Sequence, residues 1–180
     1  TSPLSVPAYH GIPVTHRDYC SSLHIITGHK RKDSRLQIDF EALVRAGGTL
    51  VFLMGVSTLP EICGGLLAAG IDPALPATVL QKGTTAAQKR IVATVSTLPE
   101  EVQRRGIETP AIIVVGEVCA LAEKLCWYEK LPLAGWKILL TRPRSLVSST
   151  AEKLRREGAE VLELPAIRTV ACADQSRLKD

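Results

Sequence analysis

The chain has 180 residues, of which 46% are hydrophobic and 22% charged, so it holds enough apolar material for a packed core. A net charge of +4 and an aromatic content of 4% exclude a strongly basic, base-stacking surface, and we expect no nucleic-acid partner. No apolar run reaches the roughly 20 residues that cross a bilayer, and the first residues lack a secretory signal. We therefore expect a soluble, cytoplasmic α/β protein with no membrane partner.

Short β-rich runs alternate with segments of helical spacing along the first part of the chain. The predicted strands are residues 23–27, 49–53, 77–80, 90–95 and 111–115. The predicted helices are residues 39–45, 59–69, 98–105 and 117–125. This alternation is typical of a layered α/β fold, and we expect a mixed sheet flanked by helices.

Two of the helix starts share one hexapeptide, Val-Ser-Thr-Leu-Pro-Glu, at 56–61 and 95–100. In each copy a Thr precedes a Glu by three residues, which is the spacing of a capping box. The two pairs are Thr58 with Glu61 and Thr97 with Glu100. The Pro stands where its missing N–H costs nothing, and the Gly that follows each helical stretch, at 70 and 106, is expected to end it.

A domain boundary is predicted at residues 131–135, which are uncharged and contain both Pro and Gly. This linker separates a domain at 1–130 from a second one at 136–180. In the second domain we expect a strand at 136–140, a helix at 151–156 behind a Ser149–Glu152 capping box, and strands at 160–164 and 167–170. About 45 residues rarely form an independent core, so we expect a truncated domain. Thr1 in place of a starting Met also favours a piece of a longer polypeptide.

The cysteines follow neither a disulfide framework nor a metal-binding pattern, because their number is odd and no CxxC spacing occurs. We expect reduced, structural thiols and no metal site. The residues concerned are Cys20, Cys63, Cys119, Cys126 and Cys172.

Three segments are candidates for a functional site. The sequence Thr15-His16-Arg17-Asp18 places a cation, an imidazole and a carboxylate together, which can bind an anion or move a proton, although a solvated loop is the alternative. Met54 follows a predicted strand, at the end where ligands gather in α/β sheets, although a single Met commonly fills a core. Gly83, followed by two Thr, permits close backbone approach and a positive φ, although an ordinary turn has the same pattern.

In this order, five motifs resemble the carboxyl-terminal half of the uroporphyrinogen-III C-methyltransferase family of tetrapyrrole methylases. They are Gly-Ile-Pro-Val-Thr-His-Arg at 11–17, Thr-Gly-His at 27–29, Met-Gly at 54–55, Gly-Thr-Thr-x-x-Gln at 83–88 and Thr-Pro-Ala-Ile-Ile-Val-Val-Gly-Glu at 109–117. The resemblance extends over residues 1–129. Residues 135–169, with Lys-Ile-Leu-Leu-Thr-Arg-Pro at 137–143, are similar to the opening of uroporphyrinogen-III synthase. Fusion of these two enzymes in one chain is a known arrangement.

The resemblance implies the fold and the chemistry of the whole protein. The fold would be α/β: the carboxyl-terminal, mixed-sheet half of a tetrapyrrole methylase, followed by the truncated β-α-β start of a synthase domain. The activity would be methylation of uroporphyrinogen III to precorrin-2, in sirohaem or cobalamin biosynthesis, by a homodimer that also carries the synthase. The methyl donor would be S-adenosyl-L-methionine, and the reaction would need no metal.

The resemblance also implies positions for a donor site. Carried over residue by residue, the donor-binding positions are Thr1, Ser2, Met54, Gly83 and Ala111. Ser2 stands where the family has Ala. The wall of the substrate site would contain Thr15, His16 and Arg17, and the cation of Arg17 suits a substrate with many carboxylates. The resemblance assigns no catalytic residue, and the Gly-Gly-Asp-Pro-like donor loop of the family matches no part of this chain.

Two alternatives stay open. One is a later precorrin methylase of the same superfamily, against which the synthase-like tail argues. The other is a half-domain without turnover that only dimerises.

Overall fold

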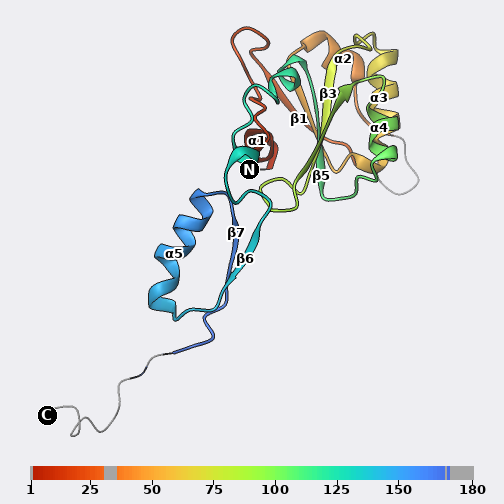
Figure 1. Ribbon diagram of the computed structural model, residues 1–180. Helices are drawn as coiled ribbons and strands as arrows, with labels where there is room; N and C mark the ends of the chain where they lie inside the picture. The colour runs from red at the N-terminus through yellow and green to blue at the C-terminus, as the bar shows by residue number, and fades with distance from the viewer. Residues whose placement is uncertain (1, 31–35, 169, 171–180) are drawn as a thin grey trace, which may run out of the picture. The chain divides into compact units, whose positions relative to one another are not determined.

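The structure is a computed structural model that describes residues 2–30, 36–168 and 170, without the side chains of 144–146. It divides the chain into two compact units, Thr1–Lys130 and Leu131–Asp180 (Figure 1). Among the described residues, no helix combines the length and the apolar character that crossing a bilayer requires.

The first unit is built on a five-stranded mixed sheet, as the sequence predicts. Its strands are β1 (Leu23–Thr27), β2 (Thr49–Leu53), β3 (Pro76–Gln81), β4 (Lys89–Thr94) and β5 (Ala111–Val115), in the spatial order β1-β2-β5-β3-β4. β1 and β2 are parallel, whereas β5 runs antiparallel to both of its neighbours, β2 and β3, and β3 and β4 form an antiparallel hairpin. The sequence predicts each strand to within one residue at either end.

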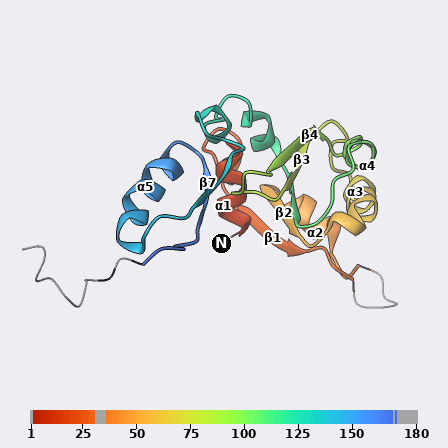
Figure 2. The ribbon, with the colours of Figure 1, turned by 60° about the horizontal axis from the view of Figure 1, so that its bottom comes forward.

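Helices cover both faces of this sheet. One face packs against α2 (Phe40–Ala46), α3 (Leu59–Ala68) and α4 (Leu98–Arg104), and α3 and α4 lie side by side (Figures 1 and 2). The other face packs against α1 (Ser2–Tyr9) and the 3₁₀ helix η2 (Glu117–Leu121). The remaining 3₁₀ turns are η1 (Val56–Thr58) and η3 (Tyr128–Lys130). The central strand β5 is apolar throughout because both of its faces are buried.

Two elements of the first unit differ from the prediction. The sequence analysis missed α1, because its Pro7 lies inside the helix, where Pro is disfavoured. The helix expected at 117–125 is instead the shorter η2, in which the amide of Ala122 bonds to the carbonyl of Cys119, three residues back. The carbonyl of Ala122 in turn accepts from the guanidinium of Arg90.

The predicted capping boxes are wrong, although α3 and α4 do begin at the predicted residues. Thr58 donates its hydroxyl to the carbonyls of Gly28 (2.5 Å) and Gly55 (3.2 Å), and no side-chain capping bond forms. Thr97 makes no capping bond either, because its hydroxyl pairs with Thr94. The predicted helix ends are confirmed: Gly70 and Gly106 have φ values of 88° and 60°, which a residue without a side chain adopts easily.

The second unit is a β-α-β piece made of β6 (Lys137–Leu140), α5 (Arg144–Arg156) and β7 (Glu160–Glu163). β6 pairs with β7 in parallel, outside the five-stranded sheet. α5 begins before the predicted Ser149–Glu152 box, which is therefore wrong as a helix start, and it buries Val147 and Ala151. The strand expected at 167–170 is also wrong for the residues described there: Ile167 and Val170 lie in no strand and are exposed, and Thr169 lies outside the described residues.

Candidate functional site

One edge of the five-stranded sheet brings three of the predicted donor-binding residues together. The parallel strands β1 and β2 both end there, and the antiparallel β5 begins there, since Leu53 is opposite Ile112 and Gln81 is opposite Ala111. Met54 directly follows β2, Ala111 opens β5, and Gly83 lies two residues after β3. We refer to Met54, Gly83 and Ala111 as the donor edge.

Met54 projects from this edge and does not fill the core. Its side chain is 58% exposed, and its φ of 55° lies in the left-handed region that non-glycine residues rarely adopt. The chain packs tightly behind it, since a Cβ on Gly28 would lie 2.8 Å from the Cα of Gly55. A Cβ on Gly55 would lie 2.8 Å from the Cδ1 of Ile62. The ends of β1 and β2 are therefore in close contact, and Met54 is held outside them.

Position 83 requires glycine for a reason that the sequence does not reveal. Positive φ values occur at its neighbours, Lys82 and Thr84, and not at Gly83 itself. A Cβ on Gly83 would overlap the side chain of Val6, so α1 packs directly on this loop. The loop is closed by its own polar groups: the amide of Thr84 donates to Oε1 of Gln88 (3.1 Å), and the hydroxyl of Thr85 donates to the carbonyl of Lys82 (2.7 Å).

Ala111 lies between the ends of the two neighbouring strands. The amide of Lys82 donates to the carbonyl of Pro110 (2.9 Å), which ties the Gly83 loop to the start of β5. Opposite Ala111, Gln81 is 4% exposed, and its Oε1 has no hydrogen-bond partner among the described residues. The donor edge thus offers a small side chain beside a buried acceptor. Sequence reasoning missed Gln81, because nothing in its spacing sets it apart.

The other predicted positions belong to segments outside the three residues of the donor edge. Thr1 falls outside the described residues, and Ser2 opens α1 with an exposed side chain. Thr15 and Arg17 are exposed, in a loop where the amide of His16 donates to the carbonyl of Cys20 (3.1 Å).

This loop is anchored at the far end of β2 from the donor edge. Sγ of Cys20 lies 3.1 Å from the hydroxyl of Thr49, the first residue of β2, whereas Met54 follows the last residue of that strand. The His16 ring stays with its own loop, 3.8 Å from a carboxylate oxygen of Asp18 and 5.1 Å from the ring of Tyr19. The structure therefore does not bring Thr15, His16 and Arg17 to the donor edge.

Two hollows lie outside the donor edge. A cavity of about 180 Å³ at the amino end of β2 is lined by residues that include Cys20, Gly48 and Gly116. An uncharged groove of about 450 Å³ runs beside α1, and its lining residues are Leu4, Ala8, Gly11, Ile12, Pro13, Val14, Thr15, Leu125 and Trp127. Because Thr15 lines this groove, the groove connects the predicted substrate loop with α1.

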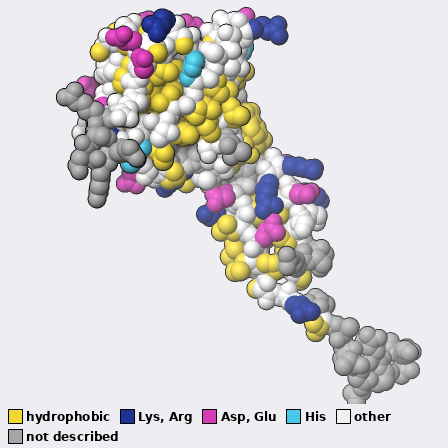
Figure 3. Space-filling model, turned by 180° about the vertical axis from the view of Figure 1, so that it is seen from behind, with side chains coloured by type: hydrophobic (Ala, Val, Ile, Leu, Met, Phe, Trp, Pro, Cys, Tyr) yellow, Lys and Arg dark blue, Asp and Glu magenta, His cyan; other side chains and the backbone are white. Residues whose placement is uncertain are grey.

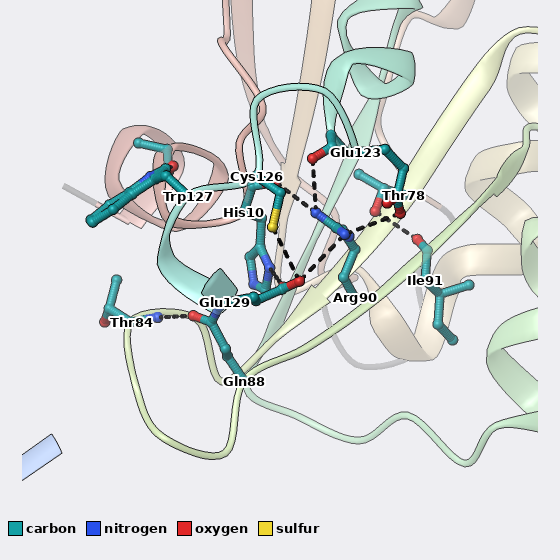
Figure 4. A network of polar contacts seen from close by, with 12 residues as sticks. His10, Thr78, Thr84, Gln88, Arg90, Ile91, Glu123, Cys126, Trp127 and Glu129 are labelled. Atoms are coloured by element: carbon teal, nitrogen blue, oxygen red, sulfur yellow. Dashed lines mark hydrogen bonds and ion pairs between the residues drawn. The ribbon is translucent and has the colours of Figure 1, made fainter. Parts of the chain in front are cut away.

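A partly buried polar network holds α1 on the side of the β3–β4 hairpin (Figure 4). The Arg90 side chain is 10% exposed, and its guanidinium donates to the carbonyls of His10 (2.8 Å) and Ala122 (3.2 Å). It also contacts the carboxylates of Glu123 (3.2 Å) and Glu129 (3.4 Å). The second oxygen of Glu129 lies 3.4 Å from Nδ1 of His10.

His10 is fully buried in this network, and apart from the contact between Nδ1 and Glu129 its ring nitrogens have no hydrogen-bond partner among the described residues. Burial lowers the pKa of His10 because it penalises the charged imidazolium. The Glu129 carboxylate opposes this shift, and the Arg90 charge adds to it. Burial is the largest of these effects, so His10 is neutral near pH 7.

The described cysteines, Cys20, Cys63, Cys119 and Cys126, are free. Burial raises the pKa of Cys63 to about 11 and also raises that of Cys119. Thiols with a raised pKa are poor nucleophiles, as expected of structural cysteines. Cys172 lies outside the described residues.

Comparison with known proteins identifies relatives for both units. The porphyrin biosynthesis protein HemD of Ruminiclostridium josui is 47% identical over 99% of this chain, and the uroporphyrinogen-III C-methyltransferase of Bacillus subtilis is 39% identical over 94%. The siroheme synthase of Methylobacillus flagellatus is 44% identical over 73%. The chain spans 35% of the length of the first two relatives and 28% of the third.

Solved methyltransferases share the fold of about two thirds of this chain. The uroporphyrin-III C-methyltransferase of Thermus thermophilus, solved with S-adenosylhomocysteine, has a TM-score of 0.55 and 28% identity, over 65% of this chain and 51% of that one. The cobalt-precorrin-4 methyltransferase CbiF has a TM-score of 0.60 over 66% of this chain and 50% of that one, and at 19% identity it shows the fold alone. Residues 1–99, more than half of the chain, match the family described as Tetrapyrrole (Corrin/Porphyrin) Methylases. The chain therefore belongs to the tetrapyrrole methylase family.

Proposed function

We propose that the chain is the carboxyl-terminal part of a uroporphyrinogen-III C-methyltransferase, which converts uroporphyrinogen III to precorrin-2 in sirohaem or cobalamin biosynthesis. The observation that carries this proposal is the meeting of Met54, Gly83 and Ala111 at one sheet edge. These are the positions that the motif resemblance assigns to the methyl donor. The Thermus relative, which was solved with S-adenosylhomocysteine, supports the same donor.

The residues of the donor edge suit a nucleoside with a sulfonium side chain. Ala111 leaves room for a flat base, and Met54 offers exposed apolar surface beside it. Backbone groups around Gly83 supply hydrogen-bonding partners, and the proposal adds the hydroxyl of Ser2, on the helix that packs on Gly83 through Val6. Oε1 of the neighbouring Gln81 has no hydrogen-bond partner among the described residues, so it can accept a hydrogen bond from an N–H or O–H group of the ligand.

When bound, S-adenosyl-L-methionine supplies a methyl group on a positively charged sulfur. A pyrrole carbon of the substrate forms the new C–C bond, the C–S bond breaks, and sulfur keeps the electron pair. The carbon is already a nucleophile, so the residues of this chain contribute by binding, orienting and excluding water. Thr15, His16 and Arg17 are the proposed substrate residues, and the exposed cation of Arg17 suits a carboxylate.

The second unit is part of the same proposal as the start of a uroporphyrinogen-III synthase domain, in a bifunctional cytoplasmic protein. The alignment with the HemD relative includes nearly the whole chain, whereas that with the siroheme synthase stops at 73%. A tail that only some relatives share would give this difference. The β-α-β order of the unit is consistent with the opening of an α/β domain.

Two other readings stay in competition. A later precorrin methylase would use the same donor edge with a different tetrapyrrole. A half-domain that only dimerises would use its apolar surface instead: hydrophobic side chains are exposed on both units (Figure 3), and the groove beside α1 is uncharged. Homodimerisation is also part of the proposed function, so a dimer alone does not separate the readings.

Calorimetric titration of this chain with S-adenosylhomocysteine tests the proposal. We expect saturable binding of one ligand per chain, whereas ATP, which shares only the adenosine moiety, should compete weakly. A chain that is folded by circular dichroism and releases no heat would contradict the proposed function. If sedimentation showed that chain to be a dimer, the half-domain reading would replace it.

A further inference from the structure

Arg90 is a largely buried cation whose contacts join three separate segments. It lies on β4, two residues after Gln88 of the Gly83 loop. Its guanidinium reaches the end of α1 through the His10 carbonyl, η2 through the Ala122 carbonyl, and the Glu123 and Glu129 carboxylates. The two carboxylates offset the cost of withdrawing the cation from water. Arg90 thus makes both hydrogen bonds to backbone carbonyls and ion pairs with carboxylates (Figure 4).

The helix that Arg90 contacts, α1, depends on tertiary contacts for its stability and position. α1 has eight residues with Pro7 inside, and helices this short are marginal without tertiary contacts. The same end of the helix is also held by the carboxyl-terminal part of the unit: Nε1 of Trp127 donates to the carbonyl of Ala8 (2.8 Å), and the Tyr9 ring lies 5.0 Å from that of Tyr128. Arg90 adds the polar contact that comes from the hairpin side.

α1 connects this network to the donor edge. Val6, in the middle of the helix, packs directly on Gly83, and Ser2 lies one turn before Val6. A shift of α1 would move both Ser2 and the packing surface of the Gly83 loop. Arg90 is on β4, the strand that follows the Gly83 loop, and it holds the end of α1. It therefore fixes the position of α1 relative to this loop.

We propose that Arg90 is a positioning residue for the donor site: by clamping the end of α1 to the β3–β4 hairpin, it keeps Ser2 and Gly83 aligned for the adenosyl ligand. The inference rests on the proposed function, because it assumes that the donor edge binds this ligand. In this proposal Arg90 acts through α1 and not by contact with the ligand.

Three variants of the present chain test the clamp. Arg90→Met keeps the apolar stem and removes every donor, whereas Arg90→Lys keeps the charge and up to three donors. Arg104→Met is the matched control, because Arg104 is an exposed Arg that pairs with Glu101 on α4. For each folded variant, calorimetry gives the affinity for S-adenosylhomocysteine, and hydrogen exchange gives the protection of the α1 amides.

We expect Arg90→Met to weaken ligand binding about tenfold or more, because a small misplacement of binding groups is costly, and to speed exchange in α1. Arg90→Lys should recover part of the affinity, and Arg104→Met should bind as the parent does. A purely structural Arg90 would lower the melting temperature without changing the affinity of the folded protein. That result, with the parent binding normally, would overturn the inference alone. A parent chain that does not bind would overturn the proposed function and this inference together.

Discussion

At Gly83, the absence of a side chain serves packing between a loop and a helix. Gly83→Leu places a large group against Val6 and at the donor edge. We expect the substitution to abolish binding of S-adenosylhomocysteine and to cost about 1–3 kcal/mol of stability through overpacking. The measurement is a calorimetric titration at a temperature where circular dichroism shows the variant folded.

Gly64→Leu is the control for Gly83→Leu, because a Cβ at this α3 position meets nothing within 4 Å. It should leave binding unchanged and stabilise the helix by up to about 1 kcal/mol. If folded Gly83→Leu bound the ligand as tightly as the parent, Gly83 would have no place in the donor site, and the 81–88 segment would be an ordinary turn.

His10 makes stability depend on pH. Burial lowers the pKa of His10 in the folded protein below the unfolded value of 6.5, so the unfolded chain takes up the proton first as pH falls. The free energy of unfolding therefore has its full value, as far as His10 is concerned, above pH 6.5. It decreases as pH falls toward the folded pKa, by at most about 1.4 kcal/mol per pH unit. Glu129, which faces the ring, limits the loss.

Urea unfolding at several pH values measures this dependence. His10→Phe should flatten the curve below pH 6.5, whereas His29→Gln, at an exposed position, should not change it. An unaltered slope in the His10 variant would show that other groups govern the acid response.

At the scale of elements, the two copies of Val-Ser-Thr-Leu-Pro-Glu differ in what their Thr does. Thr58 is 2% exposed and bridges the ends of β1 and β2, whereas the hydroxyl of Thr97 is exposed beside Thr94. We expect Thr58→Val to cost about 1–3 kcal/mol, because it removes the hydroxyl donor of the buried Gly28 carbonyl, whereas the Gly55 carbonyl keeps its bond from the amide of residue 58. Thr97→Val should cost well under half of that. Chemical denaturation of both variants tests this. Equal losses would favour the capping boxes that the sequence alone predicts.

The strands of the first unit could be predicted from the sequence because each is a compact β-branched run between turn residues. β1, β2 and β5 have the predicted boundaries, and β5 is apolar on both faces. α1 could not be predicted: its Pro7 argues against a helix, and its position depends on Val6, Arg90 and Trp127, which are distant in sequence. Local pattern carries no information about such contacts.

The candidate site, too, has residues that the sequence predicts and residues whose placement depends on distant contacts. The motif order identifies Met54, Gly83 and Ala111, and strand pairing then explains why they meet. The order does not show that residues 15–17 are anchored at the other end of β2, because that follows from the contact between Cys20 and Thr49. Nor does it show the buried, unpartnered Gln81.

For the whole molecule, the described fold consists of a unit with its own double-sided core and a short β-α-β unit. The chain also spans only 35% of its HemD and B. subtilis relatives. The central claim therefore concerns the first unit: its donor edge binds the adenosyl ligand.

The most direct test is residue-resolved. Titrating the ¹⁵N-labelled chain with S-adenosylhomocysteine and following amide shifts by NMR reports where the ligand binds, even if binding is weak. We predict saturable shifts in Met54, Gly83, Ala111 and their neighbours, with residues 137–163 of the second unit unaffected. Shifts confined to the cavity at the amino end of β2, around Gly48 and Gly116, or no shifts at all, would contradict the account.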